Sequence, residues 1–376
     1  MSNDKCKIAY LFGSLNRGGT ETLFLDVFRN ASKASFEFIG IHRKGGAYKD
    51  EFYSSGQKMM QLAPKRFGYI RYLVQLRHLL QSENITIVHA QHWLDGIYAW
   101  LATIGTDIRV INTFHGYFPM KGLNGLLCRM SIRMADEMCF VSRYEQEWYQ
   151  QQMRIDDRKC HVIFNGVDFA KIDGVECNVY GVKERIKLCM VGNFVEVRDH
   201  RTLVRALAML KGLADGRMSG LEYDFYFIGK RSEDYPYIYD ECVRVCEENK
   251  MTNIHFLGGR GDVPALLRQM DGFVYSTDHD TFGIAVVEAM AAGLPVVVND
   301  YPVMKEVCGE EESNYVTYYR SKDVDDCAEA IIKLLEDIKI SSNEFKQQCQ
   351  HNSIFVRERY SIENYIATLS HIYRKD

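Results

Sequence analysis

Two acidic side chains border an apolar, glycine-containing segment in the second half of the chain. Asp280 opens a short loop, and Glu288 lies eight positions further on, inside an apolar run over residues 284–291 that favours a helix. Unpaired N–H groups at the start of such a helix attract an anion, while a carboxylate accepts hydrogen bonds from hydroxyls. A ligand with phosphate and sugar groups fits this pattern. The alternative is that Glu288 lies at the helix rim and pairs with a lysine.

A glycine-rich turn near the start of the chain provides a second candidate phosphate site. Gly13 follows a strand-like run, and Gly18 and Gly19 precede a helix-like run. A strand-to-helix turn of this kind brings backbone N–H groups and the positive end of a helix to one place. The spacing matches neither the dinucleotide-binding fingerprint nor the P-loop, so neither a dehydrogenase nor a P-loop enzyme is indicated. The alternative is a tight turn without a ligand.

A histidine follows one of the predicted strands. His115 comes directly after a β-branched run. Parallel sheets bind ligands at the carboxyl ends of their strands, which favours a functional role for this side chain. The alternative is a structural histidine.

Short β-branched or aromatic runs alternate with longer amphipathic runs along the whole chain, which is typical of parallel sheets covered by helices. Strands are predicted over residues 8–12, 36–41, 85–89, 110–114, 138–141 and 161–164, and again over 187–191, 223–228, 254–257, 272–275 and 295–298. Helices are predicted over residues 20–29, 69–80 and 145–153, and again over 201–211, 237–248, 263–269, 284–291, 325–335 and 360–373. The pattern predicts an α/β fold with two Rossmann-like parallel sheets.

A polar, loop-like stretch over residues 168–185 separates the two series of elements. We therefore predict an N-terminal domain over residues 1–175, a second domain over 176–355 and a C-terminal helix over 356–376 that packs back on the first domain. Ser361 is placed to cap that helix, whose apolar face requires a partner surface. Residues 1–175 contain 22 basic and 17 acidic residues, whereas the rest of the chain contains 24 basic and 33 acidic residues. The net charges of the two halves therefore have opposite signs.

The composition excludes several classes of protein. The 376 residues include 46 Lys and Arg against 50 Asp and Glu, and a net charge of −4 argues against a nucleic-acid partner. Eleven scattered cysteines suit a reducing cytoplasm, and Cys242 and Cys246 lack the further ligands of a zinc site. The first residues do not form a secretory signal, and no apolar run reaches transmembrane length. A cytoplasmic protein without a bound metal is expected.

Together these motifs resemble those of the retaining nucleotide-sugar glycosyltransferases of family 4, and the resemblance covers nearly the whole chain. The family's Glu-x7-Glu pattern and Ala-Met-Ala-x-Gly-x-Pro run correspond to Asp280, Glu288 and residues 289–295. The resemblance implies the GT-B fold, in which two Rossmann-like domains face a deep cleft. It also implies that Glu288 binds the ribose and that Asp280 contacts hydroxyls of the donor sugar.

The resemblance assigns further residues to the donor. Arg198 occupies the place of a family lysine that binds the diphosphate, and Asn193 stands where the family has an arginine, so Arg260 is a candidate for the missing charge. Asp280 is one methylene shorter than the usual glutamate. The candidate catalytic residues are His115, Asp280 and Arg198. The candidate donor-binding residues are Gly18, Gly19, Asn193, Arg198, Arg260, Thr281, Phe282, Gly283, Ile284 and Glu288.

The implied reaction moves a sugar, with retention of configuration, from a nucleoside-diphosphate sugar to a hydroxyl of a glycan or lipid-linked acceptor, as in bacterial capsule or O-antigen synthesis. UDP is the favoured nucleotide, because UDP donors are common in this family. No cofactor and no metal are expected, since Arg198 and backbone dipoles stabilise the departing phosphate. Two alternatives are a non-catalytic sugar-nucleotide-binding subunit and a GT-B sugar-nucleotide epimerase.

Two stretches of the first half mix basic with large apolar residues, namely residues 65–71 and 121–133. Such stretches can rest on an anionic membrane, with Lys and Arg at the headgroups. We therefore predict peripheral contact with the inner face of a membrane as one hypothesis. The alternative is a pair of amphipathic helices whose apolar faces pack into the core.

Overall fold

The computed structural model describes residues 6–31, 36–64, 68–174, 185–213, 218 and 220–374. These residues fold as two compact units. The first unit comprises the described residues up to Val167 and those from Tyr360 onward, and the second runs from Asp168 to Arg359. The predicted join at residue 175 falls among residues 175–184, outside the described part of the chain.

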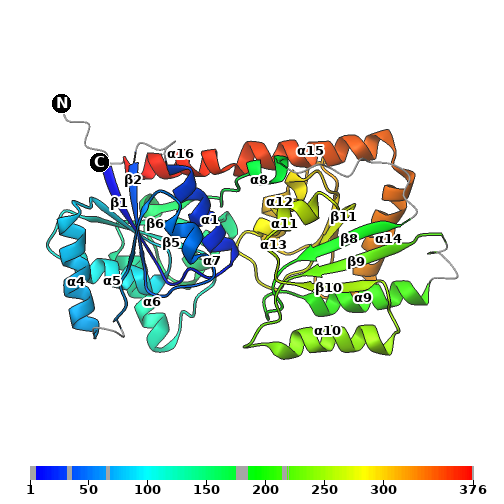
Figure 1. Cartoon of the computed structure of the whole chain (residues 1–376), viewed down its shortest axis with the longest axis horizontal. Helices are drawn as coiled ribbons and strands as arrows, with labels where there is room; N and C mark the ends of the chain where they lie inside the picture. Colours follow the sequence, from blue (N-terminus) through cyan, green and yellow to red (C-terminus); the bar gives the residue numbers. More distant parts are fainter. Residues whose placement is uncertain are drawn as a thin grey trace. The chain divides into compact units, whose positions relative to one another are not determined.

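A seven-stranded parallel sheet in the order β3-β2-β1-β4-β5-β6-β7 forms the centre of the first unit (Figure 1). The strands are β1 (Cys6–Phe12), β2 (Phe36–His42), β3 (Lys58–Gln61), β4 (Ile87–Ala90), β5 (Arg109–Phe114), β6 (Glu137–Phe140) and β7 (Cys160–Val162). The helices are α1 (Gly19–Arg29), α2 (Lys49–Tyr53), α4 (Tyr69–Ser82), α5 (Trp93–Thr103), α6 (Gly122–Met134) and α7 (Arg143–Gln152). The order reverses between β1 and β4, which is where open parallel sheets bind ligands.

Both faces of this sheet are buried, which explains why its strands are apolar without alternation. On β1, Tyr10 faces a core cluster with α1, whereas Ala9 and Leu11 face a second cluster with α4 and α5. Successive side chains of a strand point to opposite faces, so one strand contributes to both clusters.

The C-terminal helix α16 (Ile362–Tyr373) belongs to the first unit and covers the same face as α1. Its apolar face, which includes Tyr365 and Leu369, completes the cluster around Tyr10. Ser361 caps the helix, since its hydroxyl accepts a hydrogen bond from the Asn364 N–H group at 3.2 Å. The cap expected from the sequence is therefore present.

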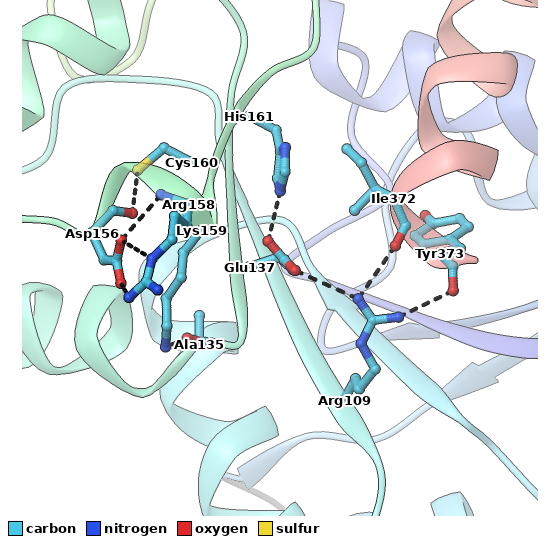
Figure 2. Close-up of polar contacts among 10 residues, drawn as sticks. All are labelled: Arg109, Ala135, Glu137, Asp156, Arg158, Lys159, Cys160, His161, Ile372 and Tyr373. Carbon is cyan, nitrogen blue, oxygen red and sulfur yellow. Dashed lines mark hydrogen bonds and ion pairs between the residues drawn. The ribbon is translucent and has the colours of Figure 1, made fainter. Parts of the chain in front are cut away.

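Arg109 fastens the far end of α16 to the sheet, as Figure 2 shows. Its guanidinium donates to the carbonyl oxygens of Tyr373, at 3.1 Å, and Ile372, at 3.3 Å, which belong to the last turn of the helix. Glu137 lies 3.8 Å from the same guanidinium and also contacts His161 Nε2 at 2.6 Å. A cation at the C-terminal end of a helix also stabilises the helix, because it interacts favourably with the helix dipole.

The second unit has a six-stranded parallel sheet in the order β10-β9-β8-β11-β12-β13. Its strands are β8 (Ile186–Val191), β9 (Tyr223–Ile228), β10 (Ile254–Gly258), β11 (Gly272–Tyr275), β12 (Val296–Asn299) and β13 (Val316–Tyr319). Its helices are α8 (Ala170–Asp173), α9 (His200–Gly212), α10 (Pro236–Glu248), α11 (Val263–Leu267), α12 (Ile284–Ala291), α13 (Pro302–Cys308), α14 (Val324–Ile340) and α15 (Asn343–Tyr360). Strands β10, β9, β8 and β11 are neighbours in the sheet. Because they are parallel, the loops that follow them lie together at its carboxyl edge.

The predicted α/β fold with two parallel sheets is confirmed, but several elements were not predicted, namely β3, β13, α2, α5, α8, α13 and α15. Helix α5 buries residues around most of its circumference, so its sequence lacks the polar stripe that marks an amphipathic helix. Strand β3 is short and half exposed, and it contains no alternating apolar pattern. The prediction for residues 263–269 was too long, because α11 ends at Leu267.

Candidate active site

An ion pair between Arg198 and Asp280 forms the centre of the candidate site in the second unit. Arg198 Nη2 lies 3.1 Å from Asp280 Oδ2, and the two side chains are 21% and 10% exposed. Arg198 belongs to the loop that follows β8, and Asp280 belongs to the loop between β11 and α12. Strands β8 and β11 are neighbours, so the sheet brings the two loops together. The sequence predicts both residues, but not that they pair.

Two side chains fix this ion pair. The Tyr275 hydroxyl donates to Asp280 Oδ2 at 2.7 Å, and the Tyr275 ring centre lies 5.3 Å from Arg198 Cζ. Arg198 Nη1 donates to Thr277 Oγ1 at 3.2 Å, while that hydroxyl donates to the Val197 carbonyl at 2.7 Å. Burial lowers the pKa of Arg198, but Asp280 and Tyr275 together outweigh burial, so the pKa is raised. The guanidinium is charged and held in one orientation.

The loop before α12 wraps around the Asp280 carboxylate. Asp280 Oδ1 accepts hydrogen bonds from the N–H groups of Thr281, at 2.9 Å, and Phe282, at 3.4 Å. Gly283 has a φ of +86°, and a Cβ atom there would lie 2.9 Å from Met304 Cε. Glycine is therefore favoured at this position by backbone conformation and by space. The predicted helix start after Gly283 is confirmed.

Glu288 is half-buried on the second turn of α12. Its sequence neighbours Val287 and Ala289 are fully buried. A carboxylate in such surroundings loses hydration, so it requires polar partners. The placement inside the helix matches the sequence prediction, and the ribose contact stays a prediction.

Asn193 takes part in backbone contacts at the same edge of the sheet. Its side chain is exposed, and Oδ1 accepts a hydrogen bond from the Lys230 N–H group at 2.9 Å. The preceding Gly192 lies beneath Arg198, since a Cβ atom there would be 3.6 Å from Arg198 Cδ. Opposite it, a Cβ atom at Gly229 would lie 1.9 Å from the Gly192 carbonyl oxygen. Only glycine fits at position 229, so these loops approach closely.

Arg260 forms a paired, half-exposed contact with Asp262. The guanidinium donates to the two Asp262 carboxylate oxygens at 2.8 and 2.7 Å. The Asp262 side chain makes no capping hydrogen bond to α11, which was the alternative considered from the sequence. Asp262 therefore balances the charge of Arg260.

In the first unit, Gly18 and Gly19 mark the start of α1 as predicted. Gly18 is the residue before the helix, and its carbonyl oxygen accepts hydrogen bonds from the Thr22 N–H and hydroxyl groups, each at 2.9 Å. A Cβ atom at Gly18 would lie 2.6 Å from Glu21 Oε2. Burial raises the pKa of Glu21. A side chain at position 18 would displace this carboxyl group.

His115 follows β5, next to β4 and close to α1. Its Nε2 atom lies 2.9 Å from Gln91 Oε1, and its ring packs edge-on against Phe24. Burial, and secondly the nearby His92, lowers the pKa of His115 to about 3, so the ring is neutral at pH 7. Since an amide oxygen is an acceptor, the proton is assigned to Nε2. His115 Nδ1 is buried and has no hydrogen-bond partner among the described residues, so it has a lone pair available for a hydroxyl.

Four residues of these sites were not predicted from the sequence, namely Gln91, Lys230, Tyr275 and Thr277. Tyr275 reads as the last apolar residue of a buried strand, and its hydroxyl was the only signal. Lys230 and Thr277 each follow a strand by two residues, a position that the rule used for His115 could have identified.

The described residues contain no group of three or more His, Cys, Asp or Glu side chains that could hold a metal ion. None of the helices that the structure describes is long and apolar enough to cross a membrane.

Two parallel-sheet units with ligand-site features at the carboxyl ends of their strands define a GT-B architecture, and comparison with known proteins agrees. Residues 17–171 match the family described as Glycosyltransferase Family 4, and residues 179–352 match Glycosyl transferases group 1. The chain therefore belongs to the family 4 glycosyltransferases of the GT-B type.

Individual relatives are distant. The N-acetyl-alpha-D-glucosaminyl L-malate synthase of Bacillus anthracis is 24% identical, over 72% of this chain and 70% of that one. The UDP-Gal:alpha-D-GlcNAc-diphosphoundecaprenol alpha-1,3-galactosyltransferase of Escherichia coli is 23% identical, over 70% of each chain. The crystal structure of Anabaena Alr3699/HepE in complex with UDP-glucose has a TM-score of 0.81 at 15% identity, and covers 97% of this chain and 98% of that one.

Proposed function

We propose that this glycosyltransferase uses a UDP-sugar as donor, retains the anomeric configuration, and transfers the sugar to a hydroxyl of a glycan or lipid-linked acceptor in bacterial surface polysaccharide synthesis. The observation that carries the proposal is the oriented Arg198 guanidinium beside the Asp280 carboxylate at the start of α12. The Anabaena relative binds UDP-glucose, and the Escherichia coli relative takes its name from a UDP-galactose donor and a lipid-linked diphosphate acceptor.

The proposed chemistry depends on stabilising charge on the departing nucleotide. When the bond between sugar and β-phosphate breaks, negative charge accumulates on that phosphate. Arg198 is held in place before the reaction, so no reorganisation is needed to stabilise this charge. Asp280 fixes the guanidinium, and the same carboxylate borders the place where the sugar attached to the β-phosphate would lie. Glu288 is the proposed ribose ligand.

In the first unit, His115 is the proposed contact for a sugar hydroxyl. Its Nδ1 lone pair accepts a hydrogen bond, while its pKa of about 3 makes it a poor proton acceptor at pH 7. The proposal therefore gives His115 an orienting role and leaves the acceptor proton to the departing phosphate. Gly18 and Gly19 are the proposed backbone contacts of the diphosphate.

The proposed partner surface for a membrane is the outer face of α4 and α6 in the first unit. Tyr69, Ile70 and Val74 of α4 are 66%, 81% and 62% exposed, and Leu123 and Leu126 of α6 are 73% and 54% exposed. Both helices also bury an apolar face, so the expected packing into the core accounts for only part of their apolar residues. Residues 65–67 of the first predicted stretch lie outside the described residues.

The charged residues of these two helices favour an anionic surface. Helix α4 contains Arg71 and Arg77, helix α6 contains Arg129 and Arg133, and neither helix contains an acidic residue. Apolar side chains flanked by cations suit a membrane interface. The proposed location is the cytoplasmic face of a membrane, and the described cysteines are free thiols, as a reducing compartment requires.

The proposal is tested by measuring UDP release from a panel of UDP-sugars, with and without lipid-linked and soluble glycan acceptors, in the presence of EDTA. The expected result is release that depends on the acceptor and is unaffected by EDTA. Binding without turnover would instead identify a sugar-nucleotide-binding subunit, and a changed donor sugar without an acceptor would identify an epimerase.

Membrane contact is tested separately by sedimentation with anionic liposomes at low salt. The variant Ile70→Glu/Leu123→Glu is expected to lose sedimentation and to keep UDP binding. Equal sedimentation of both proteins would exclude the α4 and α6 surface.

A further inference from the structure

We propose that Lys230 supplies the second cation for the donor diphosphate, besides Arg198. Lys230 is not among the site residues predicted from the sequence. This inference rests on the proposed function, since it concerns how the second unit binds a nucleoside diphosphate. It starts from the charges at the carboxyl edge of the second sheet, where a diphosphate brings two or more negative charges into one place.

Several cations at this edge are paired with carboxylates. Besides the pair of Arg198 with Asp280, the ion pairs are those of Arg201 with Glu241, Arg231 with Asp240, Arg260 with Asp262, Lys305 with Glu310, Arg320 with Asp323 and Asp326, and Lys322 with Asp278. Burial lowers the pKa of His200 to about 3, so this ring contributes no charge at pH 7. These groups therefore leave little net positive charge for an incoming anion.

Lys230 differs from these residues. It directly follows Gly229 at the end of β9, and its ammonium group forms no ion pair with any carboxylate of the described residues. The adjacent Arg231 is bound at 2.8 and 2.7 Å to the two oxygens of Asp240. Of these two neighbouring cations, Arg231 is therefore balanced by a carboxylate and Lys230 is not balanced by any carboxylate of the described residues.

The backbone of Lys230 is fixed next to the Arg198 loop. Its N–H group donates to Asn193 Oδ1, and its carbonyl oxygen accepts from the Phe194 N–H group, each at 2.9 Å. Asn193 is separated from Arg198 by four residues, and Gly192 beside it lies beneath the Arg198 side chain. Lys230 and Arg198 therefore extend from two loops that are hydrogen-bonded to each other.

Gly259 lets the Lys230 side chain lie along the same edge. A Cβ atom at Gly259 would be 2.4 Å from Lys230 Cγ and 2.8 Å from Lys230 Cε, so the aliphatic stem crosses the backbone where a side chain is missing. Gly259 follows β10, and the Gly229 N–H group donates to the Gly258 carbonyl at 3.0 Å. The stem is thus supported by the neighbouring loop, while the residue is exposed. A supported, unpaired ammonium at the strand ends is suited to a phosphate oxygen.

The experiment compares the dissociation constants of UDP and uridine for the full-length protein and its variants, measured by calorimetry. Lys230→Met is expected to weaken UDP binding roughly tenfold or more, which corresponds to the loss of one charge-assisted hydrogen bond. The same variant is expected to bind uridine like the unsubstituted protein, because uridine has no phosphate. Arg231→Met is the matched control and is expected to change UDP affinity less than about twofold.

A second variant tests the charge itself. In Asn193→Arg/Lys230→Met a new guanidinium stands on the adjacent loop, and UDP affinity is expected to recover at least in part. Equal effects of Lys230→Met on UDP and uridine, or equal effects of Lys230→Met and Arg231→Met on UDP, would overturn the proposal. Failure of the unsubstituted protein to bind any nucleoside diphosphate would overturn the proposed function, whereas tight binding that is unchanged in Lys230→Met overturns only the role of Lys230.

Discussion

Replacement of Tyr275 by phenylalanine tests the coupling of the Arg198–Asp280 pair to the sheet. The substitution keeps the ring beside the guanidinium and removes one hydroxyl, which donates to Asp280 Oδ2 at 2.7 Å. A hydrogen bond to a charged, buried group contributes about 1.5–3 kcal/mol, so the free energy of unfolding of the second unit is expected to fall by that amount. For a unit of this size, each kcal/mol lowers the melting temperature by roughly 2–4 °C.

Tyr319→Phe is the matched control for this substitution. Tyr319 is as buried as Tyr275, but its hydroxyl donates to a neutral carbonyl, that of Tyr275, at 3.4 Å. Its loss is expected to cost about 0.5–1.5 kcal/mol.

The functional readout is the rate of UDP release with saturating donor. Tyr275→Phe is expected to lower this rate, because Asp280 and Arg198 gain freedom, whereas Tyr319→Phe leaves it nearly unchanged. Equal losses of stability and of activity in the two variants would show that the hydroxyl of Tyr275 has no special role at the ion pair.

Three further predictions concern other parts of the chain. Arg109→Met is expected to lower the free energy of unfolding in a denaturant titration by about 1–3 kcal/mol, because two carbonyl groups of α16 lose a donor (Figure 2). Arg158→Met is the control and is expected to leave the free energy of unfolding nearly unchanged, because the Arg158 side chain is 89% exposed. Burial lowers the pKa of His89 to about 3, so the unfolded chain takes up a proton first as the pH falls below about 6.5. The free energy of unfolding therefore falls on acidification, and His89→Gln is expected to reduce its decrease between pH 7 and pH 5 by roughly 2 kcal/mol. An equal decrease in the two proteins would show that the His89 ring is protonated in the folded state. Glu288→Gln is expected to weaken the binding of UDP and of a UDP-sugar equally, by roughly tenfold. Weaker binding of the UDP-sugar with unchanged binding of UDP would contradict the assignment of Glu288 to the ribose.

The sequence predicts most of the two sheets, because buried parallel strands are short apolar runs bounded by polar loops. Strand β12 (Val296–Asn299) is an example, since all four of its residues are buried. Helix α12 was predicted with its exact bounds, because Gly283 and Pro295 limit the apolar run between them. Elements whose sequence shows no clear contrast between apolar and polar residues were not predicted. Examples are the buried helix α5 and the short edge strand β13.

The candidate site was predicted as a set of residues and not as an arrangement. Spacing along the chain brings Asp280 to the start of α12, but it does not reveal that the carboxylate turns toward Arg198, which is 82 residues away. That contact depends on the adjacency of β8 and β11, a property of the sheet order. The balance of charges that distinguishes Lys230 from Arg231 depends on tertiary ion pairs in the same way.

The anomeric configuration of the product distinguishes the proposed transfer with retention from transfer with inversion. The measurement is an NMR spectrum of the glycan formed from a UDP-α-sugar in the presence of the acceptor that supports UDP release. Transfer with retention gives an α-linked product. A β-linked product, or free sugar as the sole product in the presence of that acceptor, would contradict it.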